Sequence, residues 1–193
     1  MQNGNALPVS AFVDHADGTV PLGTAAYEKR GVAIDVPVWN PDACLQCNLC
    51  SYVCPHAVIR PVVMDDAAAA KAPGASVAMK GLEGKKFAVS ISVLDCTGCG
   101  SCVNVCPEVK GVKALSMTSL DSNLEAQKLF DYGLTLETPA EVLEKFKETT
   151  PKGSQFKQPL LEFSGACAGC GETPYAKLVT QLFGDRMYIA NAT

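Results

Sequence analysis

The sequence lacks three features that would direct it to a membrane, to secretion or to nucleic acid. No apolar run approaches the length of a membrane span. The first six residues contain neither the basic stretch nor the apolar core of a signal peptide, which argues against secretion and a disulfide framework. The formal net charge is −4, so we expect no affinity for nucleic acid or an anionic membrane surface. A cytoplasmic, reducing environment fits these absences.

Cysteine, by contrast, is abundant, and eight of the ten cysteines form one string that occurs twice. The runs at residues 44–55 and 96–107 both read C-x2-C-x2-C-x3-C-P, the ligand run of bacterial two-cluster ferredoxins. In that run the first three cysteines hold one [4Fe–4S] cluster and the fourth ligates the other. The rule predicts two crossed sites, one of Cys44, Cys47, Cys50 and Cys106 and the other of Cys96, Cys99, Cys102 and Cys54.

The spacing suits a cubane better than the alternatives. Two intervening residues let three thiolates converge from one tight loop, and small residues such as Gly98, Gly100 and Ser101 let backbone N–H groups approach the sulfurs. Structural zinc, the main alternative, usually takes two separated C-x2-C pairs. Disulfides are the other alternative, and the expected reducing compartment disfavours them.

The remaining two cysteines, Cys167 and Cys170, make half of a further site. A [4Fe–4S] cluster or an all-cysteine zinc site needs four ligands, and neither histidine, His15 or His56, is near this pair in sequence. We therefore expect the missing ligands in another chain or beyond Thr193. A redox-active C-x-x-C dithiol is the alternative, although such motifs usually follow a strand and open a helix directly.

Periodicity divides the chain into three parts and predicts an α+β fold. Residues 1–37 carry prolines and glycines without clear periodicity and are interpreted as an extended arm lying on other surfaces. Residues 38–121 form the cluster domain, with a half-buried strand over 87–93, a return strand over 114–117 and a surface insertion over 65–80. Residues 122–193 are helical in character.

The helical part has three predicted starts. Ser122 with Glu125, and Thr138 with Glu141, match the capping-box pattern, and Pro151 is expected to end the second helix. Thr173-Pro174 opens a third helix that ends at Gly184. The apolar stripe of that helix comprises Tyr175, Leu178, Val179, Leu182 and Phe183. A short buried strand is expected over 187–190, so that helix and strand together begin an α/β layer. A ligand-bearing loop is expected to leave this strand at residues 191–193.

The chain resembles part of pyruvate:ferredoxin (flavodoxin) oxidoreductase over essentially all 193 residues. The resemblance rests on both ligand runs and on four further segments, residues 7–12, 23–31, 161–175 and 182–187. Members of this family are several times longer, so the chain is interpreted as an internal or C-terminally cut piece. It would comprise a two-[4Fe–4S] ferredoxin-like domain with an insertion and the incomplete start of a thiamine-diphosphate-binding domain.

The resemblance implies an activity and roles for residues. The family oxidatively decarboxylates pyruvate with coenzyme A to acetyl-CoA and CO2, using thiamine diphosphate with Mg²⁺, and passes electrons singly through [4Fe–4S] clusters to ferredoxin or flavodoxin. By resemblance, Cys167 and Cys170 hold part of a third cluster near the thiamine, and Glu172 contacts that cofactor. The resemblance also implies contact with the rest of the enzyme polypeptide and a homodimer at full length. A solvated acid at a helix start is the plainer interpretation of Glu172.

Two other functional classes compete with an enzyme segment. Residues 38–121 could serve alone as a free two-cluster electron carrier, which leaves the arm and residues 122–193 without a role. A redox-inactive metal scaffold is the third class. The residues do not fix the 2-oxo acid or choose between ferredoxin and flavodoxin, and we expect the isolated chain not to turn over pyruvate.

Overall fold

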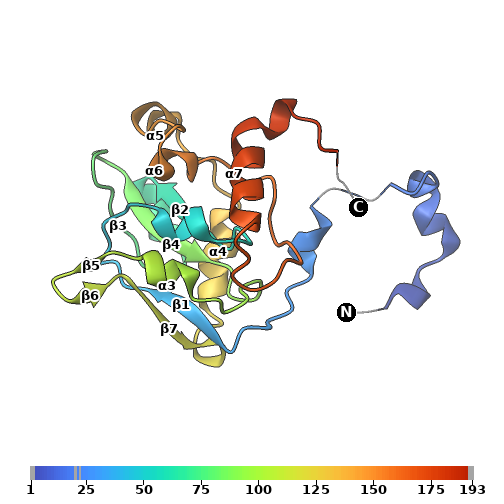
Figure 1. Ribbon diagram of the computed structural model, residues 1–193, viewed down its shortest axis with the longest axis horizontal. Coiled ribbons are helices and arrows are strands. Elements are labelled where there is room, and N and C mark those ends of the chain that lie inside the picture. The colour runs from blue at the N-terminus through green and yellow to red at the C-terminus, as the bar shows by residue number, and fades with distance from the viewer. Residues whose placement is uncertain (1–2, 20, 22, 191–193) are drawn as a thin grey trace.

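A three-stranded antiparallel sheet forms the centre of the computed structural model (Figure 1). The strand order is β2 (Ile59–Met64), β4 (Lys86–Ile91) and β3 (Val77–Ala78), and Ile59 lies opposite Ile91. β4 overlaps the strand predicted over 87–93, beginning one residue earlier and ending two residues earlier, and Val93 just beyond it is fully buried. The structure describes residues 3–19, 21 and 23–190.

A second antiparallel pair joins residues far apart in sequence. β1 (Asp35–Trp39) pairs with β7 (Leu115–Ser119), which confirms the predicted return strand. The expected boundary between residues 37 and 38 falls inside β1, and Val36 is fully buried. The chain therefore joins the folded body before residue 37. A short hairpin of β5 (Glu108–Val109) and β6 (Val112–Lys113) precedes β7.

The two cysteine runs fold into the same local structure twice. Each run makes one short helix, α1 (Leu49–Val53) or α3 (Ser101–Val105), and the two helices pack together. Asn48 (φ 60°) and Gly100 (φ 72°) precede the helices in the left-handed conformation, which asparagine and glycine tolerate best. The fourth cysteine of each run ends its helix in extended conformation, directly before proline.

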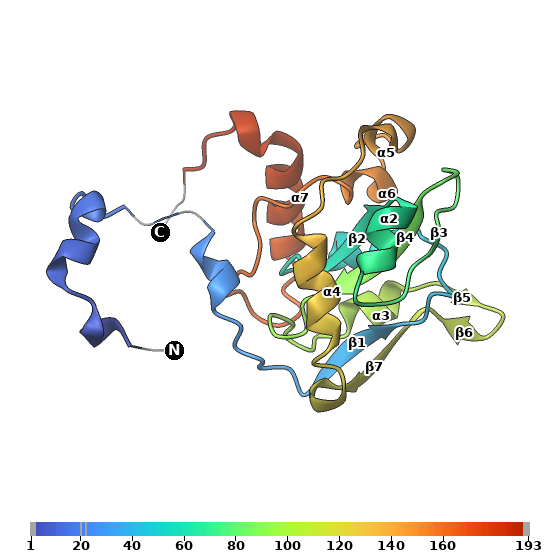
Figure 2. The same cartoon turned by 180° about the vertical axis from the view of Figure 1, so that it is seen from behind.

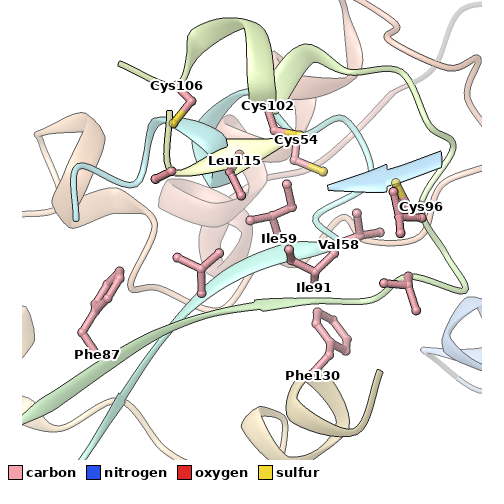
Figure 3. Packing of buried hydrophobic residues seen from close by; sticks show 14 of the residues in the cluster. Cys54, Val58, Ile59, Phe87, Ile91, Cys96, Cys102, Cys106, Leu115 and Phe130 are labelled. Carbon is pink, nitrogen blue, oxygen red and sulfur yellow. The ribbon is translucent and has the colours of Figure 1, made fainter. Parts of the chain in front are cut away.

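The sheet has the cysteine runs on one face and a helix on the other. α4 (Ala126–Gly133) packs on β4, and Phe130 from this helix is almost fully buried. Figure 3 shows Phe130 on one side of β2 and β4 and the labelled cysteines on the other, with Ile59 and Ile91 between them. Burial of these apolar side chains holds the cysteine runs in position against this face of the sheet.

The predicted insertion over 65–80 is mostly exposed but also completes the sheet. Asp65 caps α2 (Asp66–Lys71), because its carboxylate accepts from the Ala68 N–H at 2.7 Å. β3 then pairs with β4 through Val77 opposite Phe87, and Met79 is buried. The insertion therefore covers an edge of β4 rather than lying only on the surface.

The C-terminal part consists of short helices. They are a 3₁₀ turn (Leu120–Ser122), α4, α5 (Ala140–Lys145), α6 (Pro151–Ser154), α7 (Thr173–Phe183) and a last 3₁₀ turn (Gly184–Arg186). The prediction of α7 is confirmed at both ends, with proline in its first turn and Gly184 as its C-terminal cap.

Both predicted capping boxes are wrong, because neither hydroxyl accepts from an N–H of its helix and both instead donate to carbonyls elsewhere. Ser122 Oγ donates to the carbonyl of Ser119, and α4 begins only at Ala126. Thr138 Oγ1 donates to the carbonyl of Phe156, 18 residues away, so that it serves a tertiary contact. Pro151 does not end α5, which stops at Lys145. It begins α6, which the Thr150 hydroxyl caps.

The strand predicted over 187–190 is absent from the described residues. This segment has no regular structure, and Tyr188 and Ile189 are 102% and 72% exposed. A strand needs a partner for its backbone groups, and none of the described strands lies beside it. Residues 191–193, where a ligand-bearing loop was expected to leave this strand, lie outside the described residues.

The N-terminal arm contains three 3₁₀ helices, at Gly4–Ala6, Val9–His15 and Thr24–Tyr27. Figures 1 and 2 show this arm reaching away from the body on the side of α7. Val9 and Val13 are 88% and 70% exposed, so the arm buries little against this chain. Among the described helices, none is long and apolar enough to cross a membrane.

Candidate iron–sulfur centres

The structure sorts the eight motif cysteines into two cavities. The first is lined by Cys44, Cys47, Cys50 and Cys106 together with Trp39 and Phe87. The second is lined by Cys54, Cys96, Cys99 and Cys102 together with His56 and Thr97. These groups are the two crossed sets that the ligand run predicts. Figure 3 shows Cys54 of the first run beside Cys102 of the second run. Cys106, which belongs to the same run as Cys102, lies apart from both.

Helix geometry produces the crossing. α1 begins next to Cys50 and ends at Cys54, so one short helix carries ligands toward both cavities. α3 does the same with Cys102 and Cys106. Because α1 and α3 pack against each other, the end of each helix reaches the cavity that the other helix begins.

Backbone donors approach the first sulfur of each run in the same way. The Gln46 N–H lies 3.3 Å from Cys44 Sγ, and the Gly98 N–H lies 3.4 Å from Cys96 Sγ. Both donors sit on residues with positive φ, 58° and 70°, which turns their N–H groups inward. Hydrogen bonds of this kind stabilise negative charge on sulfur and raise the reduction potential of a cluster.

Three of the thiols, those of Cys50, Cys96 and Cys102, are buried where they resist ionisation without metal. Burial raises the pKa of Cys96 to about 11 and the pKa of Cys102 to about 12, and negative charge on Cys54 adds to both effects. Burial likewise raises the pKa of Cys50, with Cys102 and Cys47 adding to the effect. Thiolates in these positions therefore need a cationic core to stabilise them, and binding of that core releases protons.

The cavities also contain polar groups that fit a sulfide-rich group. Within the described residues, Trp39 Nε1 and Thr97 Oγ1 are buried donors without a hydrogen-bond partner. Trp39 lines the first cavity, and Thr97 lines the second. A buried donor without an acceptor costs about 1–3 kcal/mol, so such groups in a native fold call for a ligand. Sulfur atoms of an inserted cluster would supply acceptors there.

A single zinc ion fits this arrangement less well than a cubane. Zinc binds thiolates at about 2.3 Å, so its ligands must converge on one point. In the part of the chain that the structure describes, no three Cys, His, Asp or Glu side chains are placed to hold one metal ion. A cubane binds each thiolate to a different iron and therefore needs the sulfurs further apart.

Cys167 and Cys170 lie together in a loop outside the two cavities. Cys167 is exposed and Cys170 is half-buried, and the Cys170 N–H donates to the Cys167 carbonyl at 3.1 Å. Hydrogen bonds from the side chain and backbone of Thr173, and then from the Glu172 backbone, lower the pKa of Cys170. Glu172 is exposed and precedes α7 without capping it through its side chain.

The loop of Cys167 and Cys170 lies against the second cavity. A Cβ atom on Gly169 would sit 3.4 Å from the Cβ atom of Cys99 and 3.8 Å from Ser101 Oγ. Gly169 has φ +68°, the region that suits glycine. The pair of cysteines is thus held next to one ligand loop of the second cavity.

α7 presents to this body a side that the apolar pattern did not predict. Its buried residues are Thr173, Lys177 and Gln181, whereas Tyr175 and Phe183 of the predicted stripe are 73% and 47% exposed. Lys177 is 1% exposed and donates to carbonyls of α1. Burial lowers its pKa to about 8, against the opposing effect of Cys54. Sequence reasoning did not include Lys177 among the site residues.

Comparison with known proteins agrees with the geometry. Residues 43–109 match a 4Fe-4S double cluster binding domain, and residues 1–33 match the EKR domain, whose function is unknown. A pyruvate-flavodoxin oxidoreductase from Enterobacter agglomerans is 58% identical over 194 residues, covering all of this chain. The pyruvate:ferredoxin oxidoreductase of Moorella thermoacetica is 55% identical over 98% of the chain. The chain matches one segment of this oxidoreductase family.

The segment is a small part of these relatives. The chain spans 16% of the length of both oxidoreductases. A pyruvate dehydrogenase [NADP(+)] from Cryptosporidium parvum contains a similar segment, 52% identical over 196 residues, and the chain spans 10% of that relative. The family's double cluster binding domain is thus present here together with sequence on both sides of it.

Proposed function

We propose that this chain is the electron-relay segment of a pyruvate:ferredoxin or pyruvate:flavodoxin oxidoreductase. The observation that carries the proposal is the crossed arrangement of eight cysteines in two cavities. The ligands of one [4Fe–4S] cluster are Cys44, Cys47, Cys50 and Cys106, and those of the other are Cys96, Cys99, Cys102 and Cys54. When bound, such clusters accept and donate electrons one at a time.

The position of Gly169 supports an order for the relay. Cys167 and Cys170 supply two ligands of a third [4Fe–4S] site, and their loop packs on Cys99 of the second cavity. Electrons arriving at this loop pass to the second cavity before the first. The remaining ligands come from polypeptide outside this chain, because a cubane needs four.

The exposed side of α7 supports packing against the rest of the enzyme. Tyr175, Val179 and Phe183 are 73%, 44% and 47% exposed along one stripe, together with Tyr188 and Ile189 beyond the helix. An apolar face of this kind is covered in a stable protein. Residues 122–193 are accordingly the start of a thiamine-diphosphate-binding domain that further chain completes, and the full-length enzyme is a homodimer. Glu172, exposed at the start of α7, contacts the cofactor, which Mg²⁺ accompanies.

Lysines beside the first cavity support an acidic acceptor such as ferredoxin or flavodoxin. Lys80 Nζ donates to the Cys44 carbonyl at 2.8 Å, and Lys113 Nζ donates to the Val103 carbonyl at 2.8 Å. Lys152 lies within electrostatic range of Cys44 and Cys47. These positive charges attract an anionic partner to the outer end of the relay.

Anaerobic reconstitution with iron and sulfide tests the proposal. The chain should hold about eight irons and eight sulfides and show low-potential signals of two interacting [4Fe–4S] centres. After reduction with dithionite it should pass electrons to methyl viologen, and it should not turn over pyruvate. Four irons or stoichiometric zinc would contradict it. A fusion that restores the downstream polypeptide should add a third centre that depends on Cys167. If the fusion gains no iron, the chain is a free two-cluster carrier instead.

A further inference from the structure

Lys177 is a buried cation whose contacts all lie between the two cavities. Its Nζ donates to the carbonyls of Ser51 at 2.5 Å, Tyr52 at 3.2 Å and Cys54 at 3.0 Å. Three carbonyl acceptors match the three N–H donors of an ammonium group. The side chain is 1% exposed, so water does not share in its solvation.

Lys177 has no carboxylate partner among the described residues. Its hydrogen bonds go only to carbonyls, and the ion pairs of the described chain do not include it. A buried charge without a counterion is costly, so folds rarely keep one unless an anion lies close. The nearest groups that can become negative are Cys54 and Cys50, at the two ends of α1.

Those two cysteines belong to different cavities. Cys50 lines the first cavity and Cys54 the second, and the carbonyls that hold Lys177 come from the residues between and at these ligands. A cubane with four thiolates is anionic, and the net charge around a cluster is one of the factors that set its reduction potential. One buried ammonium at α1 therefore acts on ligands of both sites, with the effect of Cys54 larger than that of Cys50.

We propose that Lys177 is a countercharge shared by the two clusters, which raises the reduction potential of both. It is a tuning residue and not a ligand. The inference rests on the proposed function, because it requires clusters in both cavities. It also gives α7 a role in the relay, since the helix that follows Cys167 and Cys170 brings in the charge between the other two centres.

The plainer alternative is that Lys177 only caps α1. A lysine at a helix C-terminus satisfies free carbonyls and stabilises the helix. Such a cap would change the free energy of unfolding but not the reduction potentials of a protein that still folds and loads. The potentials therefore separate the two roles.

The test compares Lys177→Met with Gln181→Met in the anaerobically reconstituted chain. Gln181 is the matched control because it is also buried on α7, one turn further on, and is uncharged. Its amide donates to the Lys157 carbonyl and accepts from Gln155, without a hydrogen bond to a cysteine. Potentials are measured by redox titration followed by EPR. We expect Lys177→Met to shift both equilibria about tenfold toward the oxidised form, or about 59 mV each for a one-electron couple. Gln181→Met should shift neither, and Lys177→Arg should restore most of the effect.

Every other outcome either supports or contradicts the role of Lys177 as a shared countercharge. If Lys177→Met loads eight irons and both potentials match the unchanged chain, Lys177 is only a cap. A shift in one potential alone would overturn the shared role. If the Met variant folds but loses iron while Lys177→Arg retains it, the charge is required and the inference stands. If Lys177→Arg loses iron as well, shape rather than charge matters and the inference fails. Failure of the unchanged chain to bind eight irons would instead contradict the proposed function.

Discussion

Lys29 Nζ lies 2.5 Å from Oδ2 of Asp95, the residue immediately before Cys96. The ammonium group also lies 4.9 Å from the centre of the Phe163 ring, and Ser92 Oγ donates to the same carboxylate. The Gly31 N–H donates to the Leu94 carbonyl at 2.8 Å in the same region. These contacts attach the end of the N-terminal arm to the loop that opens the second cavity.

We predict that Lys29→Met destabilises the chain by about 2 kcal/mol. Asp95 is 5% exposed and would lose its charged partner, but Lys29 is 28% exposed, so the loss is below the ~3–5 kcal/mol of a fully buried pair. Arg30→Met is the control, because Arg30 pairs with Glu28 where both side chains are more than half exposed. It should cost less than about 0.5 kcal/mol. Denaturant unfolding measures both, and equal effects would contradict the special role of Lys29.

The crossing of the ligands predicts a pattern of double variants. Cys106→Ala and Cys50→Ala should damage the same centre, so the double variant should lose no more iron than the more damaged single variant. Cys106→Ala combined with Cys102→Ala should damage both centres, because these neighbours in sequence line different cavities. Iron analysis with EPR measures the losses. If the Cys106 and Cys102 pair behaves as one site, the assignment is wrong.

The half site predicts a reactive thiol whose pH dependence is set by Thr173. Thr173 lowers the pKa of Cys170, so between that lowered value and the ordinary one the chain holds more thiolate than a free cysteine would. Thr173→Val should raise the pKa, move the midpoint of the alkylation profile to higher pH and slow the reaction near neutrality. At high pH, where both forms are thiolate, the rates should converge.

Alkylation of Cys170 can be followed by mass spectrometry in a Cys167→Ser background. Thr180→Val is the matched control, because the Thr180 hydroxyl donates to the Ala176 carbonyl within α7 and does not contact the cysteine loop. It should leave the profile unchanged. If both threonine variants shift the midpoint equally, the effect comes from α7 as a whole and the hydrogen bond from Thr173 is not its cause.

If an acidic acceptor docks beside the first cavity, the rate of electron transfer to it should depend on the nearby lysines and on salt. Lys80→Gln and Lys152→Gln should slow electron transfer to an acidic acceptor protein several-fold at low ionic strength and flatten its salt dependence. Lys128→Gln is the control, since Lys128 lies on α4 and pairs with Glu125. Stopped-flow reduction measures the rates, with cationic methyl viologen as a second acceptor that these changes should not slow. Equal slowing with the viologen would point to damaged clusters and contradict a docking role.

Features set by neighbouring residues were predicted best from the sequence. The duplicated ligand run predicted the two groups of cysteines that now line separate cavities, because its spacing encodes the crossing directly. Thr173-Pro174 and Gly184 predicted both ends of α7, since a terminus is set by the residues beside it. The same logic failed at Ser122 and Thr138, whose hydroxyls donate to carbonyls outside the predicted helices and do not accept from a helix N–H.

Contacts between elements that are distant in sequence could not be predicted from the apolar pattern. The apolar stripe of α7 predicted the side that would be buried, yet this chain buries Lys177 and Gln181 because α1 and α6 present polar groups to them. Gln155 connects these helices, because it accepts from Ser51 Oγ at 3.0 Å and donates to Gln181 Oε1. Ser51 and Gln155 are both far from α7 in sequence, so the periodicity of α7 could not reveal the contact.

The packing of α1 against α3 has a consequence for how the protein matures. Each cavity takes its fourth cysteine from the other run, so neither can close around its iron until both runs are in place. A cluster in either cavity would then hold both runs together through its fourth cysteine. Loading of one cavity should therefore favour loading of the other, so that limiting iron yields more fully loaded molecules than two independent sites would.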